Sequence, residues 1–233
     1  EFSTGSRGGN ALLGLTYKYK WSDRFNTYGQ LLVDEFSSSD VLAKNGSYKN
    51  KTAYQLGAKY YSAFGLPNLN LQLEYNRVRP FTYSHNTVVL NYGHNNQSMA
   101  HTLGTNFSEF LAIARYRYQR FYGSLKYIQA KRGLEFVDSA DAQVFYGGSI
   151  YGSEDFREGD LNHEIGQGNT VDFKHVEFDA GYVINPVSQL KLFARVIFRS
   201  FDPEVSQSPN QKLNTTWWSI GLRTDLFNWY RDF

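Results

Sequence analysis

Nine segments of about ten residues alternate between apolar and polar side chains, and this period of two constrains the fold more than any other feature. Such alternation is typical of a β-strand with two different faces. Segment 69–77 is the clearest case, because its leucines alternate with Asn70, Gln72 and Glu74. The other segments are 11–20, 25–36, 52–61, 109–119, 122–132, 171–184, 190–201 and 218–227.

The connections between these segments alternate in length. The short ones are 21–24, 62–68, 119–121 and 185–189, and the long ones are 37–51, 78–108, 133–170 and 202–214. Antiparallel strands joined in this way are typical of outer-membrane barrels, whose short turns face the periplasm and whose long loops face outward. We therefore expect residues 1–233 to form an all-β, antiparallel transmembrane β-barrel in the bacterial outer membrane. Its long loops would be extracellular, and its short turns and C-terminus periplasmic.

Aromatic residues, which make up 17% of the chain, gather beside the short connections. Rings with a polar edge favour the headgroup level of a membrane, so this grouping predicts an aromatic girdle. Its expected members are Tyr17, Tyr19, Trp21, Tyr60, Tyr61, Phe64, Tyr116, Tyr118, Phe121, Tyr182, Trp229, Tyr230 and Phe233.

Charged residues occupy the positions between the apolar ones. An unpaired Arg or Lys at the bilayer midplane costs roughly 2–4 kcal/mol, so these side chains are expected to face the lumen. They are Arg115, Arg117, Lys126, Glu177, Asp179, Arg195, Arg199, Arg223 and Asp225. The net charge of +2 gives no reason to expect a nucleic-acid partner, and the absence of cysteine excludes a thiolate metal or redox site.

The last predicted strand ends close to a C-terminal aromatic residue. Trp218, Leu222 and Phe233 have the pattern expected of a signal for the barrel assembly machinery, and outer-membrane lipid or lipopolysaccharide would surround the strands. The competing interpretation is the buried last strand of a soluble sandwich. Nine strands is an odd number, whereas single-chain bacterial barrels usually have an even one. We expect either that the chain is the C-terminal portion of a larger barrel or that a further strand lies within 133–170.

Three stretches resemble one family. "RPFTYSH" (79–85), "YGHNNQSMAHTLGTNFSE" (92–109) and "LRTDLFNWYRDF" (222–233) are similar to the Wzi-type capsule assembly family and its gliding-motility relative RemB in Bacteroidota. The resemblance implies a barrel of about eighteen strands, of which nine would be the C-terminal half. It also implies a non-enzymatic protein that binds or organises surface polysaccharide in capsule assembly or gliding motility.

Carried onto this chain, the resemblance places glycan contacts in the long outside loop 78–108. The candidates are Arg79, Tyr83, His85, His94, Asn95, His101, Asn106 and Glu109. Aromatic, amide, guanidinium and carboxylate groups can all hold sugars. Arg79, His85 and His101 could instead fix the loop internally, because the polar groups of a buried loop need partners.

Other readings of the same residues remain. The three loop histidines with Glu109 could bind a metal, although their spacing matches no compact motif, and no cofactor is expected. Ser84 and Ser98 could serve a barrel hydrolase, but no nucleophile-elbow pattern occurs. The acidic stretches 152–160 and 202–204 could bind calcium but lack EF-hand spacing. A passive porin or channel, and a barrel subunit that docks other outer-membrane proteins in a larger complex, are the alternatives from other functional classes.

Overall fold

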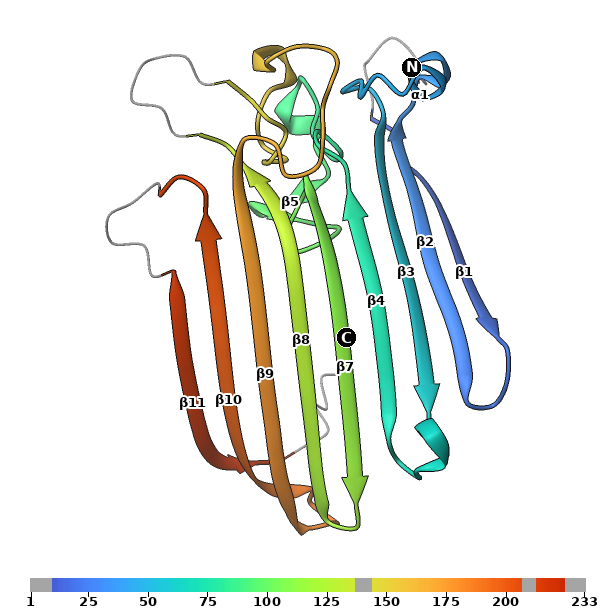
Figure 1. The fold of residues 1–233 in the computed structure, drawn as a ribbon, viewed down its shortest axis with the longest axis vertical. Coiled ribbons are helices and arrows are strands. Elements are labelled where there is room, and N and C mark those ends of the chain that lie inside the picture. Colours follow the sequence, from blue (N-terminus) through green and yellow to red (C-terminus); the bar gives the residue numbers. More distant parts are fainter. Residues whose placement is uncertain (1–9, 137–143, 207–212, 225–233) are drawn as a thin grey trace, which may run out of the picture.

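The computed structural model describes residues 10–136, 144–206 and 213–224, and it consists mainly of one antiparallel sheet of nine strands (Figure 1). The strands pair in chain order, each with its predecessor and successor. They are β1 (Leu13–Lys20), β2 (Phe25–Glu35), β3 (Lys51–Tyr61), β4 (Asn70–Val78), β7 (Phe107–Tyr118), β8 (Phe121–Leu134), β9 (Asn169–Asn185), β10 (Leu190–Pro203) and β11 (Asn214–Arg223). The all-β, antiparallel part of the prediction is confirmed.

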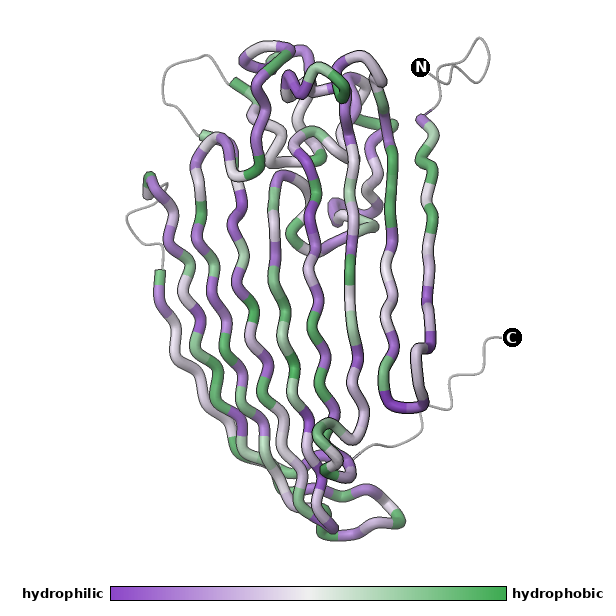
Figure 2. The backbone as a smooth tube through the Cα atoms, turned by 45° about the vertical axis from the view of Figure 1, so that its right-hand side comes forward, coloured by the Kyte–Doolittle hydropathy of each residue, from purple (hydrophilic) through white to green (hydrophobic). Residues whose placement is uncertain are grey.

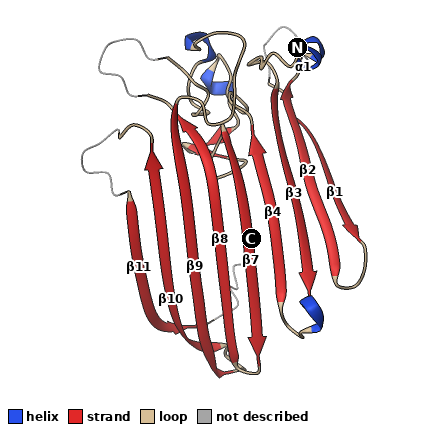
Figure 3. Cartoon of the chain, viewed as in Figure 1, coloured by secondary structure: helices blue, strands red, loops and turns tan. Residues whose placement is uncertain are grey.

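Among the described residues, helical structure is confined to the connections (Figure 3). It comprises α1 (Ser38–Ala43) and the 3-10 turns η1 (Ala63–Gly65), η2 (Val88–Leu90) and η3 (Glu154–Phe156). In the described part of the chain, no helix is long and apolar enough to cross a membrane. A separate hairpin, formed by β5 (Gly93–His94) and β6 (Gln97–Ser98), lies within the segment that joins β4 to β7.

The connections alternate between short and long, as predicted. All the short turns lie at one end of the strands and the long segments gather at the other, which is the upper end in Figure 1. The turn between β7 and β8 contains only Gln119 and Arg120, and Gln119 takes a positive φ of 52°. This end is called the short-turn end below, and the opposite one the long-loop end.

Strand register separates the side chains into two faces, and Figure 2 shows polar and apolar residues alternating along the strands. One cross-strand row contains Leu71, Ala114, Leu125, Phe178, Val196 and Trp218. The next contains Asn70, Arg115, Ser124, Asp179, Arg195 and Ser219. The face carrying the first row is called the apolar face, and the one carrying the second row the polar face.

Large side chains on the apolar face are open to the surroundings, for example Leu73 at 52% and Trp218 at 72% exposure. Several charged groups on the polar face instead pair across strands, with Lys126 bound to Glu177 at 2.6 Å and Arg195 to Asp179 at 2.9 Å. Nine charged residues were predicted to face the lumen. Eight of them belong to the polar face by register, and the ninth, Asp225, lies outside the described residues. Along these strands, the apolar side chains therefore lie mainly on one face of the sheet, and the eight charged side chains lie on the other.

Most of the buried apolar residues lie at the long-loop end, whereas Ala63 and Val183 are buried near the short turns. Ala53, Val78, Tyr83, Phe107 and Ile150 form one cluster, against which Leu12, Leu32, Tyr92, Leu103 and Tyr151 pack. Full burial of a side chain such as Phe107 contributes roughly 1.5–3 kcal/mol. This cluster holds the long segments onto the ends of the strands.

The two edge strands of the described sheet are β1 and β11. With nine antiparallel strands in sequence, both edges run from the long-loop end to the short-turn end, so they would pair in parallel if they met. Within the described residues the sheet is open.

Candidate functional site

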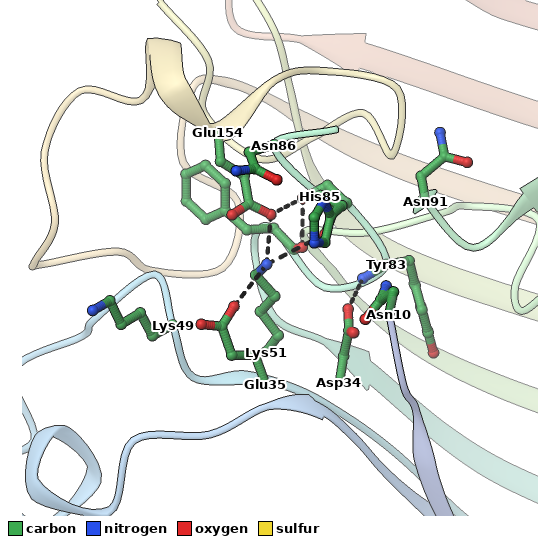
Figure 4. Close-up of polar contacts among 12 residues, drawn as sticks. Asn10, Asp34, Glu35, Lys49, Lys51, Tyr83, His85, Asn86, Asn91 and Glu154 are labelled. Carbon is green, nitrogen blue, oxygen red and sulfur yellow. Dashed lines mark hydrogen bonds and ion pairs between the residues drawn. The ribbon is translucent and has the colours of Figure 1, made fainter. Parts of the chain in front are cut away.

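Segment 79–106 leaves β4 and turns back over the polar face. Its first turn requires Phe81 and Tyr83 to adopt positive φ values of 65° and 73°. Such values are unfavourable for bulky residues and need support from the surroundings. The carboxylate of Asp34 supplies it by accepting the backbone N–H of Tyr83 at 2.8 Å (Figure 4).

A buried ammonium group joins this segment to two others. Lys51 Nζ lies 2.5 Å from Glu154 Oε1 and 3.0 Å from Glu35 Oε2, and it donates to the carbonyl of Ser84 at 3.3 Å (Figure 4). The Lys51 and Glu154 side chains are only 3% and 8% exposed. Because a buried charge must be paired, this contact fixes segments 79–106 and 144–168 against the start of β3.

Arg79 and Asn106 join the long segments at a second point. Arg79 Nη2 donates to the carbonyls of Ser47 and His163 at 3.4 and 3.5 Å, and burial is the main cause of its lowered pKa. Asn106 is fully buried, donates to Gln167 O at 3.0 Å and accepts from Gly166 N at 2.7 Å. Both side chains therefore hold the protein's own backbone.

A cavity of about 260 Å³ lies between segment 79–106 and the polar face of β2, β3 and β4. Its polar lining includes Gln30, Gln55, Asn76, Tyr83, Tyr92 and His101, and Leu32, Val78, Met99 and Phe107 supply apolar surface. We call it the loop-end cavity.

Tyr83 and Tyr92 form one side of the loop-end cavity. The centroids of their rings lie 5.7 Å apart, and the angle between the ring planes is 30°. Burial raises the pKa of the Tyr83 hydroxyl to about 12, so that group remains a hydrogen-bond donor at neutral pH. Tyr92 is half-buried and contributes a second ring face. Flat aromatic surfaces of this kind can stack on the apolar face of a sugar ring.

His101 is held from both sides. Its Nε2 lies 3.2 Å from Glu109 Oε1, its Nδ1 accepts the N–H of Leu103 at 3.1 Å, and its ring packs on Phe107 with centroids 4.6 Å apart. Asn76 Nδ2 donates to the same Glu109 oxygen at 2.9 Å. The ring is therefore fixed where it meets the cavity.

Amide groups from three strands form the opposite wall. Gln55 and Asn76 each donate an amide N–H to Glu74 Oε1 at 3.0 Å. These two hydrogen bonds fix the orientation of both side-chain amides. In the part of the chain that the structure describes, the exposed amide of Gln30 makes no side-chain hydrogen bond. Amides in such positions can bind hydroxyl groups as donors and as acceptors.

The eight predicted contact residues therefore fall into different places. Only Tyr83 and His101 line the loop-end cavity, with Glu109 directly behind His101. His85 accepts the N–H of Thr87, while His94 and Asn95 are exposed on the β5–β6 hairpin, where Asn95 and Asn96 form the turn with positive φ. Arg79 and Asn106 serve as internal ties, so we leave them out of the proposed site.

Several lining residues were not singled out from the sequence. Gln30, Gln55 and Asn76 lie in segments that were predicted as strands, and nothing in the sequence indicated that they share one cavity with Tyr92 and Met99. Among the described residues, no three histidine or acidic side chains come together in a way that could hold a metal ion. No protein-family model matches the chain, and no curated protein matches it.

Proposed function

We propose that the chain forms part of an outer-membrane β-barrel that binds surface polysaccharide in the loop-end cavity, without catalysis. The long loops face the cell exterior in this proposal, and the short turns face the periplasm. The observation that carries the membrane placement is the apolar face, whose leucines, phenylalanines and tryptophans are exposed without any covering layer in the described residues. In lipid, such a surface is solvated rather than exposed.

The height of the apolar face supports this placement. Phe110 and Tyr118 on β7 are both exposed on that face, and the eight-residue step between them spans roughly 27 Å along the strand. The apolar band of membrane barrels is of the same order, about 25 Å. Closer to the long loops, the same face carries a row of Arg77, Ser108, Lys131, Asp172 and Asp202, which would lie above the hydrocarbon.

Aromatic side chains support the orientation of the sheet. Tyr17, Tyr19, Trp21, Tyr116, Tyr118 and Phe121 are exposed near the short turns. Tyr19 and Trp21 are in edge contact with ring centroids 4.6 Å apart. Rings at the end of an apolar band suit the membrane interface.

The resemblance of 79–85 and 92–109 to the Wzi-type capsule assembly family agrees with the chemistry of the cavity. Paired tyrosine rings, a fixed histidine and amides on three strands form a neutral surface suited to sugar hydroxyls rather than to a charged cofactor. Segment 79–106 also covers part of the polar face, which suits a binding barrel better than an open pore.

Binding of purified surface polysaccharide to the full-length protein in detergent tests this function. We expect Tyr92→Ala and His101→Ala to weaken binding by about tenfold each, equivalent to about 1.4 kcal/mol. His94→Ala is the matched control, because His94 is exposed on the hairpin and does not line the cavity. Equal binding by all variants would contradict the proposal. Solute flux through liposomes at porin rates would favour the passive channel instead.

A further inference from the structure

We propose that the polar face carries a second binding site, for a small oxyanion such as a carboxylate or a phosphate, at the short-turn end. A cavity of about 340 Å³ lies there, and Arg115, Arg117, Tyr122, Ser124, Asp179 and Arg223 line it. We call it the turn-end cavity. The turn-end cavity lies at the opposite end of the strands from the loop-end cavity. Anion binding there does not depend on the function proposed for the loop-end cavity.

Register explains why the three arginines meet. Arg115 and Arg117 are two positions apart on β7 and therefore point to the same face, where Arg115 lies opposite Ser124 and Ser124 opposite Asp179. Arg223 reaches the same cavity from β11, three strands beyond β8 in the sheet. Its Nη2 lies 3.0 Å from the hydroxyl of Tyr122 on β8, so the polar face is concave at this end.

Gly181 makes this approach possible. A Cβ atom at this position would come within 2.5 Å of the Tyr122 hydroxyl oxygen and 2.3 Å of the Leu192 carbonyl oxygen. Without a side chain on β9, the Tyr122 ring can lie across that strand toward Arg223. The tyrosine thereby helps to fix one guanidinium of the turn-end cavity.

Positive charge in the cavity exceeds negative charge. Asp179 is its one carboxylate among the lining residues, and it is already bound by Arg195 at 2.9 Å and by Arg223 at 3.5 Å. Within the described residues, the Arg117 side chain makes one hydrogen bond, to the carbonyl of Gln119 at 3.4 Å. Arg115 makes no ion pair or side-chain hydrogen bond with any residue that the structure describes. Two guanidinium groups thus lack an acidic partner within the described residues.

The chemistry of these groups selects the ligand class. Guanidinium presents several N–H donors in a planar fork that matches the oxygens of a carboxylate or a phosphate. Ser124 adds a hydroxyl beside Arg115. A neutral sugar would gain little from such a site, whereas an acidic sugar or a phosphate group would be bound by charge and geometry together.

Calorimetric titration of the full-length protein in neutral detergent at low salt tests the proposal. The probes are inorganic phosphate and glucuronate, with glucose as the uncharged counterpart of glucuronate. We expect at least one of the two anions to bind and glucose not to bind at this site. The tighter anion identifies the source of the ligand, and binding should weaken as salt screens the charges.

Variants locate the binding. The double change Arg115→Gln and Arg117→Gln should weaken anion binding by at least about tenfold, or about 1.4 kcal/mol. Arg199→Gln is the control, because Arg199 belongs to the same face but lies over the rings of Phe173 and Phe201, away from the cavity. This change should alter binding by less than about twofold. The proposal is overturned if neither anion binds, if the double variant binds normally, or if Arg199→Gln weakens binding equally.

Discussion

The ammonium group of Lys51 lies 2.5 Å from a carboxylate oxygen of Glu154, a residue 103 positions further along the chain. Glu35 completes the contact from the neighbouring strand at 3.0 Å. The pair is buried at the long-loop end, where segments 79–106 and 144–168 come together. The arrangement of the outer segments, and therefore the shape of the loop-end cavity, depends on it.

Replacing the buried ammonium should release these segments without unfolding the sheet. Lys51→Met leaves two carboxylates near each other without their cation, and breaking a buried pair in this way costs roughly 3–5 kcal/mol. We expect faster hydrogen exchange at the amides around Ser84 and Glu154, with the central strands unchanged. Lys49→Met is the control, because the Lys49 side chain is exposed and its ammonium group lies 6.0 Å from the centre of the Tyr48 ring. Unchanged exchange in Lys51→Met would show that the ion pair does not hold the segments.

Asn106 should matter for stability rather than for ligand contact. Asn106→Ala removes the groups that bind Gly166 N and Gln167 O, and leaving those partners buried costs about 1–3 kcal/mol. We expect segments 79–106 and 144–168 to become sensitive to protease at lower urea concentration.

Asn96→Ala provides the matched control for that change. Asn96 has a φ of 59° and Asn106 one of 56°, so both alanine variants carry the same backbone cost, but Asn96 is exposed. If the two variants lose protease resistance to the same extent, the buried hydrogen bonds of Asn106 contribute nothing.

Gly181 should tolerate no side chain. Gly181→Ala would force a Cβ against the Leu192 carbonyl and the Tyr122 hydroxyl. Crowding of this kind should lower the free energy of unfolding by roughly 1–3 kcal/mol. We expect a lower urea midpoint for unfolding of the detergent-solubilised protein. In Gly123→Ala the nearest atom would be 3.8 Å away, so that variant should unfold as the wild type does. Equal midpoints for the two variants would contradict the packing described for β8 and β9.

The strands could be predicted from the sequence because their period is local. Segment 69–77 differs from β4, Asn70–Val78, by one residue at each end, and the alternation of short and long connections was also correct. Because successive side chains of a strand point to opposite faces, an apolar residue followed by a polar one indicates which face each occupies. The strands can therefore be predicted without knowing the contacts between distant parts of the chain.

The candidate site was less predictable because it depends on contacts between distant segments. Lys51 and Glu154 look like ordinary charged residues in the sequence, and only the folded chain brings them together. Asn106 has the side chain of a sugar-binding residue, yet its environment makes it a link between two loops. Residue type alone does not distinguish these roles, since the same amide can bind a ligand or a backbone group.

In the proposed barrel, the apolar face meets lipid while the polar face is enclosed. Leu73 and Gln72 are adjacent on β4 and belong to opposite faces, so spin labels placed singly at these positions in the full-length protein in lipid vesicles compare the two environments directly. We expect the label at 73 to collide mainly with oxygen, which concentrates in lipid, and the label at 72 to collide more with a water-soluble nickel complex. A label at 73 that is as accessible to the nickel complex as the label at 72 would contradict this placement of the two faces.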